Sequence, residues 1–109
     1  MESIMAKEAK EILERNRNVI IVDVRRPKEF AVRRIQGAIL LPVRDIEDRA
    51  EELLPDLNAE ILVYCESGPR SITAGLMLEE LGYTNVKSIG GIARWPYEID
   101  DKPLDLEAL

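Results

Sequence analysis

The sequence predicts a single α/β domain with a mostly parallel sheet of five (or four) strands and helices on both faces. Short apolar runs alternate with amphipathic segments, which is the pattern of strands joined by crossover helices. The β-branched run over 19–24 shows no polar alternation, as expected of a strand covered on both faces. A chain of 109 residues suits one hydrophobic core. We therefore expect one domain over residues 1–109, of which 97–109 form an acidic C-terminal tail.

The expected elements follow from apolar spacing and from proline and glycine positions. Residues at i, i+3 and i+4 predict helices, and β-branched runs predict strands. Ser3 is expected to cap the first helix and Gly82 to end the longest one, while 19–24 is expected to be the central strand. In chain order we expect a helix over 3–15, a strand over 19–24, a helix over 27–32, a strand over 38–41, a helix over 46–54, a strand over 61–64, a helix over 71–81, a strand over 86–89, a turn at 90–91 and a helical turn over 92–95.

Charge and composition exclude several classes of function. A net charge of -6 disfavours nucleic acid and anionic membrane surfaces as partners. No apolar stretch approaches the length of a spanning helix and the start of the chain lacks a leader pattern, so we expect a cytoplasmic protein. With one cysteine and no histidine, an internal disulfide and a Cys–His dyad are impossible, and neither a metal nor a cofactor is expected.

The single cysteine, Cys65, lies where an apolar run meets a predicted helix. Strand 61–64 precedes it, and Arg70 closes the six-residue stretch that Cys65 begins. Because the unpaired N–H groups of a first helical turn attract anions, this position favours a thiolate or an anionic sulfur species. Gly68 allows successive amides to converge, and Pro69 stiffens the approach to Arg70.

A lone cysteine beside an apolar strand is more often a small buried hydrophobic residue without chemistry. Three features favour chemistry here. Cys65 follows the strand, glycine and proline come soon after it, and an arginine closes the loop. The sequence therefore indicates a nucleophilic cysteine.

Three ordered blocks of sequence carry a family resemblance that runs nearly from end to end. The chain resembles a single-domain rhodanese, a sulfurtransferase homology domain. The blocks are Asp23-Val24-Arg25 with Glu29-Phe30, Ile35, Gly37-Ala38 and Pro42; Tyr64-Cys65 with Gly68 and Arg70-Ser71; and Gly82 with Asn85-Val86, Gly90-Gly91 and Trp95.

This resemblance implies a sulfurtransferase that moves a sulfane sulfur through a persulfide on Cys65. The donor would be thiosulfate or a persulfide, and the acceptor cyanide, a thiol or a protein sulfur carrier. We expect Arg70 to hold the anionic end of the donor or to stabilise the loop. The backbone of the loop would cradle the terminal sulfur and bind the substrate, through Glu66, Ser67, Gly68, Pro69 and Ser71. A monomer or a weak homodimer is expected.

Two other functions stay open. Many rhodanese-like domains resemble partner-binding or sensing modules without turnover, although the presence of both Cys65 and Arg70 argues for catalysis. Phosphatases and arsenate reductases of related fold place five residues between cysteine and arginine, whereas this chain has four. The shorter loop between Cys65 and Arg70 leaves room for one terminal sulfur, whereas a tetrahedral oxyanion needs a wider loop.

Several charged residues near the predicted site have a structural and a functional interpretation. Glu66 either points to solvent or opposes the thiolate and repels thiosulfate, in which case Glu66→Lys raises turnover. We expect Arg25 to pair with Glu29 at i, i+4 spacing, and Arg33 and Arg34 to be surface charges. Where the family pattern has a histidine before Ile35, this chain has Arg34. Tyr64 and Trp95 are expected in the core, and the charges of 47–52 on a solvated helix face.

Overall fold

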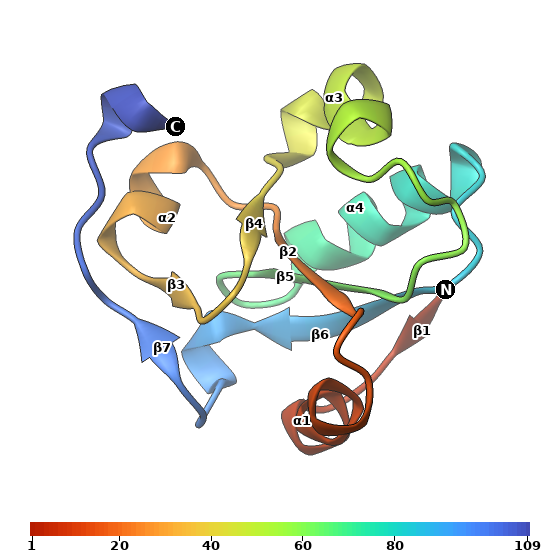
Figure 1. Ribbon diagram of the computed structural model, residues 1–109, viewed down its shortest axis with the longest axis horizontal. Helices are drawn as coiled ribbons and strands as arrows, with labels where there is room; N and C mark the ends of the chain where they lie inside the picture. The colour runs from red at the N-terminus through yellow and green to blue at the C-terminus, as the bar shows by residue number, and fades with distance from the viewer.

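The computed structural model describes all 109 residues and contains a five-stranded sheet whose neighbouring strands are all parallel (Figure 1). The predicted α/β fold is confirmed. In sheet order the strands are β1 (Glu2–Ser3), β6 (Val86–Gly91), β5 (Ile61–Cys65), β2 (Ile20–Asp23) and β4 (Ile39–Leu40). A separate antiparallel pair joins β3 (Arg34–Ile35) to β7 (Ile99–Asp100).

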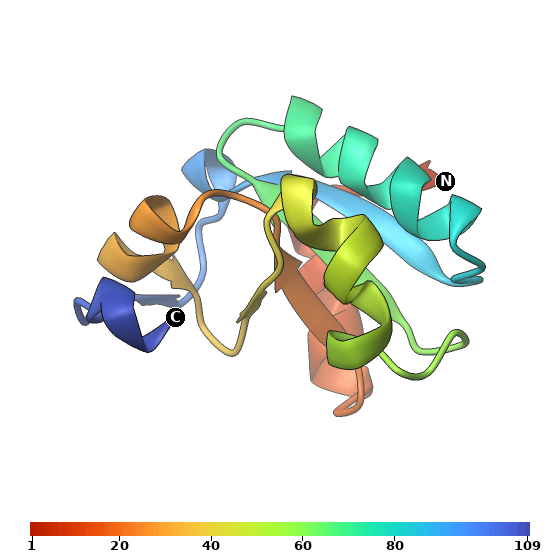
Figure 2. The same cartoon turned by 90° about the horizontal axis from the view of Figure 1, so that it is seen from above.

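Helices cover both faces of the sheet. They are α1 (Ala6–Arg15), α2 (Pro27–Val32), α3 (Ile46–Leu53) and α4 (Pro69–Glu80), with 3₁₀ turns at Val43–Asp45, Ile92–Arg94 and Leu106–Ala108. Figure 1 shows α3 and α4 above the sheet and α1 below it, and Figure 2 shows α3 and α4 lying over the strands. None of these helices is both long and apolar enough to cross a membrane.

The sheet separates two apolar clusters. One includes Val22, Val63 and Cys65 and packs under α3 and α4; the other includes Ile21, Leu62 and Tyr64 and packs against α1. Successive residues of β2 and β5 thus point to opposite faces, and both faces are buried. This explains why these strands read as continuous apolar runs in the sequence.

Some elements differ from the prediction. The central strand is β5, not 19–24, because β6 and β1 both lie on the side of β5 opposite β2. Ser3 lies in β1 and caps no helix; Met5 precedes α1 instead. Gly90 and Gly91 continue β6 where a tight turn is expected. In α4, Ile72 and Leu76 are 46% and 50% exposed, so this helix is less buried than its apolar content predicts.

The predicted end of α4 is confirmed. Gly82 has a φ of +104°, and the next residue, Tyr83, donates its N–H to the carbonyl of Leu78. The Gly82 N–H donates to the carbonyl of Glu79. These two bonds form the Schellman motif, in which a glycine adopts the left-handed conformation that ends a helix.

The acidic tail makes specific contacts with the domain. Its β7 pairs with β3, and the N–H of Leu104 donates to the carbonyl of Ala31 in α2. Residues 101–109 are nevertheless all exposed. Beyond β7 the tail therefore lies along α2, as both views show, whereas Tyr97 and Ile99 at its start pack against the apolar cluster on the α1 side.

Candidate active site

The cysteine loop lies at the carboxyl edge of the sheet, between β5 and α4. Cys65 is the last residue of β5 and pairs with Gly91 of β6. The helix begins at Pro69, two residues earlier than predicted, so Arg70 belongs to its first turn. Gly68 links the two with a φ of +128°, a conformation that residues with a Cβ rarely adopt.

The sulfur of Cys65 points into this loop. The Gly68 N–H donates to Sγ at 3.0 Å, and the Gly90 carbonyl oxygen lies 3.9 Å from it. The residue is only 1% exposed and also contributes to the apolar cluster under α4. Cys65 is therefore both a buried residue and the acceptor of an amide hydrogen bond from its own loop.

The amides of the loop divide into two groups. Those of Glu66, Ser67 and Arg70 donate to no atom of the chain, while the Ser71 amide donates to the Gly68 carbonyl at 3.2 Å. Pro69 has no N–H. The expected cradle running from Glu66 to Ser71 is thus smaller than predicted, and excludes its last member.

Ser71 supports the loop with its side chain. Its buried hydroxyl donates to the Gly68 carbonyl at 2.7 Å and lies 2.8 Å from the hydroxyl of Ser88 in β6. It also lies 3.3 Å from the Gly90 carbonyl oxygen. The hydroxyl of Ser71 thus links the loop to β6, whereas the substrate contact expected of Ser71 concerned its backbone amide.

Arg70 forms a two-pronged ion pair with Glu29 of α2. Its Nη1 and Nη2 lie 2.8 Å and 3.1 Å from the two carboxylate oxygens. These hydrogen bonds lower the pKa of Glu29 to about 2 and raise the pKa of Arg70. Of the two roles considered for Arg70, the geometry favours holding the loop over binding a free anion.

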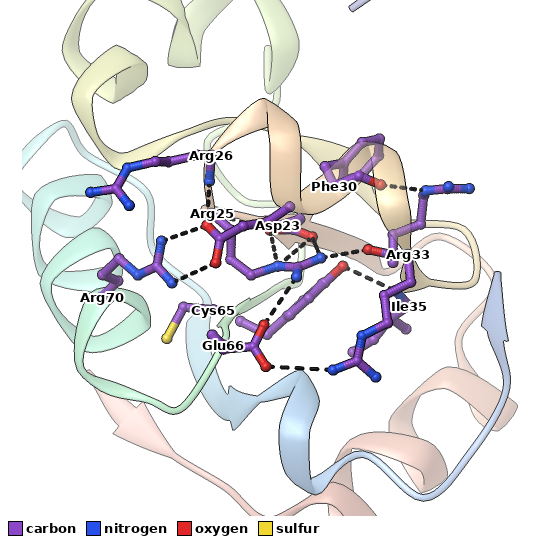
Figure 3. A network of polar contacts seen from close by, with 12 residues as sticks. Asp23, Arg25, Arg26, Phe30, Arg33, Ile35, Cys65, Glu66 and Arg70 are labelled. Carbon is purple, nitrogen blue, oxygen red and sulfur yellow. Dashed lines mark hydrogen bonds and ion pairs between the residues drawn. The ribbon is translucent and has the colours of Figure 1, made fainter. Parts of the chain in front are cut away.

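Arg25 joins β2 to the cysteine loop (Figure 3). It is 2% exposed; its Nε and Nη2 donate to the Asp23 carboxylate at 2.8–3.1 Å, and its Nη1 lies 3.2 Å from Glu66. Burial alone would lower the pKa of Arg25, but hydrogen bonds to Asp23 and its charge outweigh burial and raise it. The predicted pairing of Arg25 with Glu29 is wrong, because Glu29 faces Arg70.

The carboxylate of Glu66 contacts two arginines and does not point freely into solvent. Besides Arg25, its carboxylate contacts Nη2 of Arg33 at 3.5 Å, and its side chain is 38% exposed. Two arginines thus offset the negative charge next to Cys65. Repulsion of an anionic donor by Glu66 is correspondingly weaker than the sequence suggests.

Arg34 is buried, which contradicts the prediction of a surface charge. It is 4% exposed, donates to the Phe30 carbonyl at 2.9 Å and pairs with Asp100 of β7 at 2.9 Å. Arg33 is 44% exposed, as predicted. Tyr64 and Trp95 are buried, and the charged residues of 47–52 are exposed, also as predicted.

A cavity of about 520 Å³ adjoins the loop, and no sequence pattern predicts it. Two lining residues, Pro69 and Arg70, belong to the start of α4. Its remaining walls come from the ends of β2 and β4 and from α4: Val24, Arg25, Arg26, Pro42, Val43, Arg44 and Thr73. Segments far apart in sequence meet there, so single-residue patterns could not reveal it.

Together, the fold and the loop define a parallel α/β domain with its only cysteine in a strand-to-helix loop. The sequence profile of the rhodanese-like domain matches residues 5–97. The chain belongs to the rhodanese-like domain family, which confirms the resemblance drawn from the three motif blocks.

Relatives of this chain include proteins named as sulfurtransferases. The thiosulfate sulfurtransferase PspE of Escherichia coli is 38% identical over 71 residues, which cover 65% of this chain and 68% of PspE. The putative sulfurtransferase YtwF of Bacillus subtilis is 30% identical over 102 residues, covering 94% of this chain and 97% of YtwF. The crystal structure of the Alr3790 protein from Anabaena has a TM-score of 0.85 at 26% identity, covering 96% of this chain and 84% of that one.

Proposed function

We propose that this protein is a sulfurtransferase that carries a sulfane sulfur as a persulfide on Cys65. The observation that carries the proposal is the hydrogen bond from a loop amide to the sulfur, in a loop that has three further amides without an acceptor. The Gly68 N–H already donates to Sγ, and the amides of Glu66, Ser67 and Arg70 have no acceptor in the chain. Such donors stabilise an anionic terminal sulfur.

In the first half-reaction the Cys65 thiolate attacks the outer sulfur of thiosulfate. A sulfur–sulfur bond forms to Cys65, the bond to the sulfonate breaks, and sulfite leaves with that electron pair. The product, an anionic persulfide, needs only hydrogen-bond donors for stabilisation, which the loop amides provide. Arg70 acts as a positioning residue, because its guanidinium ties the first turn of α4 to Glu29.

In the second half-reaction cyanide or a thiolate attacks the outer sulfur. The bond between the two sulfurs breaks, and the electron pair returns to Cys65 as thiolate. The donor and acceptor thus use the same residue in turn, which is a ping-pong scheme. One cysteine suffices for both steps.

Access to Cys65 requires movement of the loop, because the residue is 1% exposed. The segment that covers it contains the exposed Ser67 and the half-buried Gly68, and Gly68 has no side chain to restrict its backbone. The loop is anchored at its start, where the Glu66 carbonyl accepts the Ala93 N–H, and at its end, where Arg70 pairs with α2 and Ser71 bonds to β6. Movement is therefore confined to the residues between these anchors.

Intact-mass measurement after incubation with thiosulfate tests the proposal. We expect the wild-type protein to gain the mass of one sulfur atom, which a reducing thiol or cyanide then removes. Cys65→Ser should gain none, and because the side chains are nearly equal in size its fold should be preserved.

The control is Ser3→Ala, which removes an exposed hydroxyl outside the cysteine loop. It should load sulfur as the wild type does. A wild-type protein that gains no sulfur from thiosulfate or from an organic persulfide would instead be a binding module. A sulfur gain that persists in Cys65→Ser would also refute the proposed role of Cys65.

A further inference from the structure

We propose that the cavity beside the cysteine loop binds an organic thiol carrying two negatively charged groups, and that this thiol is the sulfur acceptor. The inference rests on the proposed transfer of sulfur through Cys65. It adds a binding site formed by Arg26 and Arg44, neither of which takes part in the Cys65 loop.

The charge of the cavity wall is the first argument. Four arginines and no acidic residue line it, although the chain as a whole carries a net charge of -6. Arg25 is neutralised by Asp23 and Glu66, and Arg70 by Glu29. The two remaining arginines are therefore the cations that a ligand would meet.

These two arginines lack strong partners within the chain. The Arg26 guanidinium forms no ion pair, and Arg44 has only a 4.0 Å contact with the neighbouring Asp45. Guanidinium groups gathered around one cavity repel one another, and a bound anion relieves that repulsion while accepting paired hydrogen bonds. A ligand with two anionic groups can pair with both of these arginines at once.

Size and the apolar wall are the second argument. A volume of about 520 Å³ falls within the range of sites for organic ligands. Cyanide, sulfite or thiosulfate would leave most of it unfilled. Val24, Pro42, Val43 and Pro69 provide an apolar wall against which a carbon skeleton can pack.

The position of the cavity is the third argument. Pro69 and Arg70 line it and also close the loop that holds Sγ, so a ligand seated on the arginines lies next to the loop and can extend its thiol end toward it. Its thiolate attacks the outer sulfur of the Cys65 persulfide, the sulfur–sulfur bond breaks, and Cys65 recovers the electron pair. The acceptor leaves as a persulfide, and no oxidant or reductant is needed.

The test measures unloading alone. The protein is first loaded with thiosulfate and desalted, and the decay of the persulfide is then followed by mass for three thiols. These are mercaptosuccinate with two carboxylates, coenzyme A with phosphates, and neutral 2-mercaptoethanol. The proteins compared are wild type, Arg26→Gln/Arg44→Gln and the control Arg17→Gln/Arg49→Gln, which removes the same charge from exposed positions outside the cavity.

We expect the rate ratio of at least one anionic thiol to 2-mercaptoethanol to fall about tenfold in the cavity variant. The same ratio should be unchanged in the control variant. Comparing ratios between proteins cancels the intrinsic reactivity of each thiol, and the anionic thiol whose ratio falls shows whether carboxylates or phosphates are bound. Equal ratios in all three proteins would overturn the inference. Failure of the wild type to load sulfur would refute the proposed function instead, so the two failures are distinguishable.

Discussion

Gly91 of β6 lies directly against the backbone of Glu66 in the cysteine loop. A Cβ at Gly91 would stand 2.6 Å from the Glu66 carbonyl carbon and 2.6 Å from the Cα of Ser67. The chain is kept close at this point because the Glu66 carbonyl accepts the N–H of Ala93 at 3.1 Å. The backbone of the loop thus packs directly against the end of β6.

Gly91→Ala should therefore displace the loop from β6. The neighbours of the new methyl group are backbone atoms, which cannot turn aside as a flexible side chain can. We expect a loss of about 1–3 kcal/mol in the free energy of unfolding, which is usual for overpacking. Sulfur loading of Cys65 should fall as well, because the Gly68 amide would no longer meet Sγ. Urea unfolding and intact mass after thiosulfate treatment measure the two effects.

Gly75→Ala is the matched control. Its Cβ would meet the side chain of Met1, a flexible group that can move away, and alanine favours the helix α4 more than glycine does. Stability should be equal or higher, and sulfur loading unchanged. If Gly75→Ala and Gly91→Ala behave alike, close packing at Gly91 does not matter to the loop.

The buried pair of Arg25 and Asp23 makes a stability prediction. Asp23→Asn keeps the shape of the side chain but removes the buried carboxylate that pairs with Arg25, which leaves only the partly exposed Glu66 as its partner. Removing one partner of a buried ion pair costs about 3–5 kcal/mol, so chemical denaturation should show a loss of that order. Glu52→Gln breaks the exposed pair with Arg49 and should change stability by less than about 0.5 kcal/mol. Similar losses in both variants would mean that burial of Arg25 has no energetic consequence.

How much of the fold and of the candidate site could be predicted depends on how far apart in sequence the interacting residues lie. Apolar spacing located β2, β5 and α4, because periodicity depends only on neighbours in sequence. The partners of Arg25 and Arg70 could not be found in this way. Arg70 pairs with Glu29 across 41 residues, whereas i, i+4 spacing assigned Glu29 to Arg25.

The sequence did contain a signal for one missed residue. Asp23 ends a run of apolar β-branched residues, where a charge is costly unless it is paired. For Arg34 no comparable signal existed. It is buried only because β7 folds back along β3 and supplies Asp100, and the tail that contains β7 shows no clear periodicity.

The contacts of Glu66 in the structure change what we expect of its substitution. Because Arg25 and Arg33 contact the carboxylate, Glu66→Lys would gather three cations and should lower stability. Glu66→Gln is the cleaner test of repulsion, since it removes the charge and keeps the shape. We expect its kcat/KM with thiosulfate to rise only about two- to fivefold, a small effect of one screened charge. Steady-state assays in low and high salt measure it, and the gain should shrink as salt rises. A decrease in kcat/KM would show that Glu66 matters through loop position and not through charge.

The ion pair between Glu29 and Arg70 should make stability depend on pH in the acidic range. The pKa of Glu29 is lowered from 4.5 to about 2 in the folded protein, mainly by its hydrogen bonds to Arg70. A folded-state pKa below the unfolded one means that this stabilisation is present above about pH 4.5 and is lost as the pH falls through about 2. The Glu29 side chain is 29% exposed, so solvent screening limits the contribution to about 1 kcal/mol.

Urea unfolding of wild type and Glu29→Gln across this pH range measures the effect. The wild type should be more stable than the variant at pH 6, and the difference should decline steadily between about pH 4.5 and pH 2. Glu52→Gln, which breaks an exposed pair on α3, serves as the control and should show little difference from wild type at either end. A difference in stability between wild type and Glu29→Gln that stays constant with pH would mean that the pKa of Glu29 is the same in the folded and the unfolded protein. The contact between Arg70 and α2 would then be stabilised by packing and not by charge.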